Sequence, residues 1–60
     1  MYRVDAFELN GYGYLDHVKL EFNSLGMARS YVDSIKTRYK SIFILKKNAV
    51  GSYDVLEQIK

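Results

Sequence analysis

The sequence has no cysteine and no proline, and it has a single histidine. The lack of cysteine excludes disulfide bonds and thiolate zinc sites, and it fits the reducing environment of a cytoplasm. The one histidine, His17, does not form a structural metal site without several carboxylates beside it. We therefore expect no metal and no cofactor.

Long apolar runs are also missing. None approaches the roughly 18 residues of a membrane span, and the N-terminal residues lack the apolar core of a secretion signal. We expect a cytoplasmic protein without a membrane partner. Apolar residues make up 48% of the 60-residue chain and charged residues 27%, which is typical of a folded protein. We expect a single domain, 1–60, near the lower size limit for independent folding, for which self-association would help.

The first half of the chain predicts a β-hairpin. Residues 2–9 and 14–22 have the alternating pattern of strands, and Asn10 to Gly13 favours a turn. We expect a three-residue loop with a glycine bulge, which pairs Val4 with Val18 and Asp5 with His17.

The middle of the chain predicts a helix. Five apolar residues follow at spacings of 3, 4, 3 and 4, and they form one stripe on a helix of about four turns. Asn23 or Ser24 is suited to the N-cap, and Gly26 in the first turn indicates close packing on the sheet. The stripe consists of Leu25, Ala28, Val32, Ile35 and Tyr39.

The C-terminal part predicts a second hairpin. Residues 41–47 contain an apolar run that is typical of a central strand covered on both faces. Residues 52–59 alternate, with Tyr53, Val55 and Ile59 on one face. We therefore expect an α+β fold of order β-β-α-β-β: a four-stranded, mainly antiparallel sheet with one helix packed on one face and strand order 2-1-3-4. The predicted core consists of Tyr2, Val4, Val18, Leu20, Phe22, Leu25, Ala28, Val32, Ile35, Tyr39, Ile42, Ile44, Val55 and Ile59.

The sheet face away from the helix is predicted to be apolar. A single helix covers only one face, and the uncovered face of a solitary monomer should be polar. Contiguous apolar patches of several hundred Å² mark interaction sites. We therefore expect a non-enzymatic protein-binding module whose partner is either a second copy, forming a homodimer, or another protein. The predicted partner-binding residues are Phe7, Leu9, Leu15, Phe43, Leu45 and Leu56.

A basic stretch supports an alternative function. Between Asp33 and Asp54 there are five basic residues and no acidic one. Cations beside tyrosines are typical of single-strand binding, although the same lysines also suit a helix C-terminus and the ends of an apolar strand. The alternative is therefore a small basic nucleic-acid-binding regulator. Its candidate residues are Lys36, Arg38, Lys40, Lys46 and Lys47.

Catalysis has little support in the sequence. Asp5 opposite His17, with Asp16 beside it, is the single acid–base group. It has no nucleophile with a defined oxyanion site, and a chain of this length offers little concavity to exclude water. We expect no enzyme, no catalytic residue and no small-molecule substrate.

One segment resembles part of a known class. Glu21 to Ala28, followed by Tyr31 and by Tyr39 before an apolar strand, resembles the strand–helix–strand of phage proteins that inhibit host RNA polymerase. The composition also resembles that of small early or accessory proteins of tailed bacteriophages. The resemblance implies binding to a host protein in the host cytoplasm, which it would inhibit or redirect. It carries over no functional residue.

Overall fold

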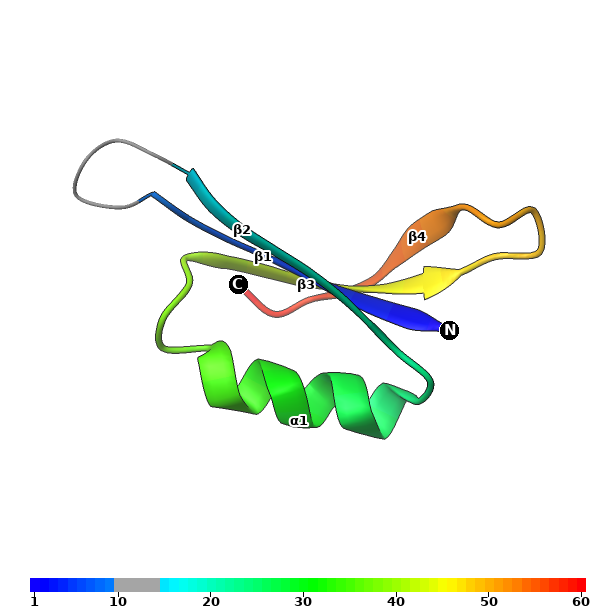
Figure 1. The fold of residues 1–60 in the computed structure, drawn as a ribbon, viewed down its shortest axis with the longest axis horizontal. Coiled ribbons are helices and arrows are strands. Elements are labelled where there is room, and N and C mark those ends of the chain that lie inside the picture. Colours follow the sequence, from blue (N-terminus) through cyan, green and yellow to red (C-terminus); the bar gives the residue numbers. More distant parts are fainter. Residues whose placement is uncertain (10–14) are drawn as a thin grey trace.

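The computed structural model describes residues 1–9 and 15–60, which form an antiparallel sheet with a helix on one face (Figure 1). The order of the four strands in the sheet is β2-β1-β3-β4. The predicted α+β fold and strand order are therefore confirmed. The predicted turn at Asn10 to Gly13 lies outside the described residues. The elements are β1 (Tyr2–Leu9), β2 (Leu15–Phe22), α1 (Leu25–Ile35), β3 (Ser41–Lys47) and β4 (Tyr53–Gln58).

The register of the first hairpin differs from the predicted one by two residues. Val4 lies opposite Leu20 rather than Val18, and Leu9 lies opposite Leu15. A shift of two residues leaves every side chain on its predicted face, because side chains alternate with a period of two. The two residues that we expected to pair, Asp5 and His17, now lie opposite Lys19 and Phe7.

The core lies between α1 and the middle of the sheet. Val4, Ala6, Ile42 and Ile44 are fully buried, because β1 and β3 are the two central strands. Most of the predicted core is confirmed, and Ala6 is an addition that the prediction lacked. The helix contributes the buried residues Ala28, Val32 and Ile35.

Two residues were wrongly predicted to lie in the core. Leu20 is 43% exposed because it lies on the edge strand β2, and Val55 is 61% exposed because it lies opposite Leu45 on the other face of the sheet. The helix packs mainly against β1, β2 and β3, and the β3–β4 hairpin extends beyond it (Figure 1).

The helix begins as predicted and ends earlier than predicted. The Ser24 hydroxyl accepts a hydrogen bond from the N–H of Met27 at 3.2 Å, which is the usual N-cap geometry. At the other end the Arg38 N–H donates to the Ile35 carbonyl at 2.8 Å, a tighter turn that ends the helix. The Lys60 ammonium donates to the backbone carbonyls of Lys36 and Tyr39. The chain therefore leaves the helix before Tyr39, since β3 begins at Ser41.

A β-bulge changes the faces of β4. The pairing with β3 shifts between Ile44 and Leu45, so that Glu57 lies opposite Ile44 while Val55 lies opposite Leu45. One extra residue in a strand reverses the alternation on one side of the bulge. The prediction of which sheet face each β4 side chain lies on is therefore right at the end of the strand and wrong at its start.

No helix in the described part of the chain has the length and apolar character needed to cross a membrane.

Candidate functional site

The sheet face opposite α1 is not covered by any element among the described residues, and we call it the open face. Its side chains follow from the strand registers, because residues directly opposite one another share a face. Buried and half-buried aromatic and charged side chains lie close together on this face. The open face includes Arg3, Asp5, Phe7, His17, Lys19, Glu21, Phe43, Leu45, Tyr53 and Val55.

A polar network crosses the open face from β2 to β4. The Arg3 guanidinium donates two hydrogen bonds to the Asp5 carboxylate, at 2.8 and 3.0 Å. The same guanidinium lies 4.5 Å from the centre of the Tyr53 ring, and the Tyr53 hydroxyl donates to Glu21 at 2.8 Å. Two parallel bonds and a stacked ring hold the guanidinium in one orientation. The network therefore presents a fixed pattern of charge.

The environment of Tyr53 changes its ionisation. Partial burial and the hydrogen bond to Glu21 raise the pKa of the Tyr53 hydroxyl above its usual value of 10.0, while the nearby Arg3 charge opposes this rise. The phenol is therefore protonated at neutral pH, and it keeps donating to Glu21.

An aromatic cluster lies beside this network. Phe7 and His17 are stacked with their ring centres 4.2 Å apart, and Phe7 meets Phe43 edge to face at 6.4 Å. Both phenylalanines are half-buried and His17 is exposed. Aromatic pairs in such geometries are stabilising beyond the area that they bury. The cluster is therefore an aromatic surface next to the charged network.

The predicted partner-binding residues divide into four groups. Phe7 and Phe43 lie together on the open face, as we expected. Leu45 also faces that side but is buried, at 8% exposure, between Arg3 on β1 and Val55 on β4. The side chains of Leu9 and Leu15 lie outside the described part of the structure.

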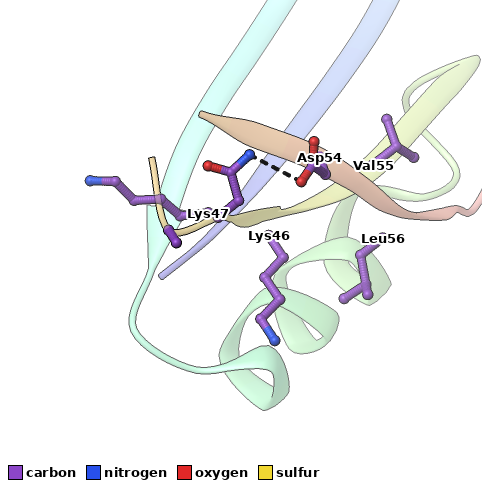
Figure 2. Close-up of a pocket in the computed structure, with 7 residues that line it drawn as sticks. Lys46, Lys47, Asp54, Val55 and Leu56 are labelled. Carbon is purple, nitrogen blue, oxygen red and sulfur yellow. Dashed lines mark hydrogen bonds between the residues drawn. The ribbon is translucent and has the colours of Figure 1, made fainter. Parts of the chain in front are cut away.

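Leu56 is the fourth group, and its predicted place on the open face is wrong. Figure 2 shows Leu56 and Lys46 pointing to one side of the sheet and Val55 to the other. Lys46 lies opposite Tyr2, on the helix side of the sheet. The bulge in β4 moves Leu56 to that side, so it does not join the phenylalanines.

The predicted acid–base pair is not formed. Asp5 holds Arg3 at 2.8 Å, and His17 stacks on Phe7 instead. Within residues 1–9 and 15–60, no group of three or more acidic or histidine side chains is placed to hold a metal.

The predicted basic stretch is divided between the two ends of β3. Lys36, Arg38 and Lys40 precede the strand, and Lys46 and Lys47 end it. At about 3.3 Å per residue, the two groups lie roughly 20 Å apart. Adjacent residues on a strand also point to opposite faces, so the last two lysines are directed away from each other. The structure does not gather these cations into one patch.

A shallow hollow of about 410 Å³ lies at the β3–β4 hairpin, lined by residues that include Lys46, Asn48 and Asp54 (Figure 2). The amide nitrogen of Asn48 donates to Asp54 at 3.1 Å, and its oxygen accepts from the backbone N–H groups of Val50 and Ser52. Asn48 thus uses its polar atoms to hold the turn. The hollow is therefore a structural feature of the hairpin.

The binding residues predicted from the sequence did not include the polar part of the open face. The alternation of β1 alone places Arg3 and Asp5 on the same face as Phe7, so this signal was available. The contribution of Tyr53 was not, because it depends on the bulge in β4.

Comparisons with known proteins give no guide to this surface. The chain matches no family model, and the searches of curated proteins and of solved structures found no match.

Proposed function

We propose that this protein is a non-enzymatic protein-binding module that acts by occupying a partner's surface with its open face. The observation that carries the proposal is the juxtaposition of the Arg3–Asp5 pair with the Phe7–Phe43 aromatic pair on an uncovered sheet. Aromatic and arginine side chains are enriched at protein interfaces and among the residues that contribute most to binding. The acid–base pair that the sequence offered, Asp5 with His17, is not formed.

The preorganised state of these side chains supports the proposal. The Arg3 guanidinium is already ordered by Asp5 and Tyr53. Ordering a long side chain on binding costs about 0.5–1.5 kcal/mol. An arginine that is held before the partner arrives avoids much of that cost.

The partner that we propose is another protein in a reducing cytoplasm. The absence of cysteine is consistent with that compartment. The resemblance of Glu21 to Ala28 to phage inhibitors of host RNA polymerase suggests a host protein that is blocked or redirected. A nucleic-acid partner receives less support, because the basic residues are split between the two ends of β3.

The test compares two lysine substitutions on opposite sides of the sheet. We expect Phe43→Lys to abolish capture of a protein partner from host lysate treated with nuclease, because it places a charge in the aromatic cluster. Leu56→Lys is the matched control, since Leu56 is 46% exposed and lies on the other side. Equal capture by both variants, with both folded, would contradict the proposal. Capture that disappears with nuclease would indicate nucleic acid instead.

A further inference from the structure

Among the described residues, no strand pairs with the outer edge of β2, so its outward backbone groups can pair with another strand. The Lys47 N–H donates to the Met1 carbonyl at 3.0 Å, and the Lys40 N–H donates to the Phe7 carbonyl at 3.0 Å. Odd-numbered residues of β1 therefore point their backbone groups at β3. Because these groups alternate along an antiparallel strand, the even-numbered residues of β1 bond to the even-numbered residues of β2 opposite them. The odd-numbered residues of β2 then point outward.

The two edges of the sheet differ in their suitability for pairing. β4 has six residues and a bulge in its pairing with β3, and bulges at edges are a common device against unwanted strand pairing. β2 has eight residues, all paired with β1 in one regular register. The regular edge of β2 is therefore the one that can accept another strand.

Exposed apolar side chains lie beside the β2 edge. Leu20 is 43% exposed on β2, and Met27 is 55% exposed on α1. Met27 lies one helical turn from Tyr31, which packs on Phe22 of β2 with ring centres 5.4 Å apart. The helix thus places this methionine on the side of the molecule where β2 forms the edge.

The charged residues of β2 are complementary to those of a second, antiparallel copy of β2. Backbone pairing across the edge must join outward-pointing residues, which are odd-numbered, so the register is restricted. With Leu20 opposite the same residue of a second antiparallel strand, Lys19 lies opposite Glu21 on both sides of the centre. Val18 then lies opposite Phe22. Centring on Lys19 instead would place like charges opposite each other, which is destabilising.

We infer that two copies of this chain pair through β2 in the register centred on Leu20. The result is a continuous eight-stranded antiparallel sheet with both α1 helices on the same face. The pairing forms two Lys19–Glu21 cross-strand pairs and covers Leu20 with its counterpart. It leaves Phe7 and Phe43 uncovered, and the open-face residues that it uses are Lys19 and Glu21.

Charge exchange tests both the dimer and its register. Lys19→Glu alone places two carboxylates opposite each other, and Glu21→Lys alone places two ammonium groups opposite each other. We expect each variant to raise the dissociation constant of the dimer about tenfold or more, as measured by sedimentation equilibrium. A mixture of the two variants should form a heterodimer, because every facing pair is then of opposite sign. The double variant K19E/E21K should dimerise again.

The controls separate this inference from the proposed function. Lys47→Glu makes the same change of charge on the central strand β3 and should leave the dimer intact. Phe43→Lys should lose the partner protein and still dimerise. Circular dichroism establishes that the variants are folded. A wild-type monomer at all concentrations, unchanged association of Lys19→Glu, or a mixture that fails to associate would overturn the inference.

Discussion

At the scale of single residues, the buried Asp5 carboxylate depends on the Arg3 guanidinium for its hydrogen bonds. Asp5 is 8% exposed, and burying a charge without a partner is costly. The two bonds from Arg3 satisfy both carboxylate oxygens. The Asp33–Lys36 pair is different, since its atoms are 3.5 Å apart and the Asp33 side chain is 74% exposed. Exposed pairs of this kind contribute little to stability.

We expect Asp5→Asn to reduce the free energy of unfolding by about 1–3 kcal/mol, because the amide keeps the volume but leaves the guanidinium without its charged partner. Asp33→Asn is the matched control and should change the free energy by less than about 0.5 kcal/mol. Urea unfolding followed by circular dichroism measures both. If both variants lowered the free energy of unfolding equally, burial of the Arg3–Asp5 pair would not determine how much that pair contributes to stability.

At the scale of elements, two glycines have opposite roles. Gly26 lies in the first turn of α1, where an added Cβ meets no atom within 4 Å. The expected close packing of Gly26 on the sheet is therefore wrong. Gly51 lies in the β3–β4 turn with φ +89°, a backbone conformation that residues with a Cβ rarely adopt.

Alanine at these two positions should have effects of opposite sign. Gly26→Ala should stabilise the protein by about 0.5–1 kcal/mol, because alanine favours the helix and space is available. Gly51→Ala should destabilise it by about 1–2 kcal/mol, because the turn requires a positive φ. Urea midpoints that move in the same direction would contradict this assignment of roles.

At the scale of the whole molecule, the single helix leaves much of the sheet uncovered. The fully buried residues are concentrated on β1 and β3, and the edge residue Leu20 remains exposed. The molecule is also elongated, with extents of 39 × 22 × 15 Å. Small domains of this kind gain stability when a second copy covers exposed apolar surface.

Stability should therefore depend on protein concentration. Pairing through β2 stabilises only the folded state, so the thermal midpoint should rise as the concentration passes the dissociation constant. Each 1 kcal/mol gained corresponds to a rise of about 4–8 °C for a domain of this size. Lys19→Glu, which opposes pairing, should show a midpoint that does not change with concentration. If the thermal midpoint rose equally with concentration in the wild-type protein and in Lys19→Glu, pairing through β2 would be excluded as the cause of the rise.

Much of the fold could be predicted from the sequence, because the deciding patterns are local. The stripe of Ala28, Val32 and Ile35 has the spacing of a helix face, and the apolar run in residues 41–47 identifies a central strand. The candidate site was only partly predictable. Phe7 and Phe43 were placed on the correct face, since a register error of two residues preserves faces. Arg3 was not among the predicted binding residues, although its alternation with Asp5 and Phe7 places all three on one face.

The sequence by itself determined the order of the elements, the inward face of the helix and the central position of β3, because these depend on periodicity along the chain. The tertiary structure alone decided which apolar residues on the sheet are available to a partner. Leu45 is buried between neighbouring strands, and Leu56 moves to the helix side through the bulge. The physical reason is that a bulge and a strand register arise from hydrogen bonds between strands, which alternation within one strand does not contain.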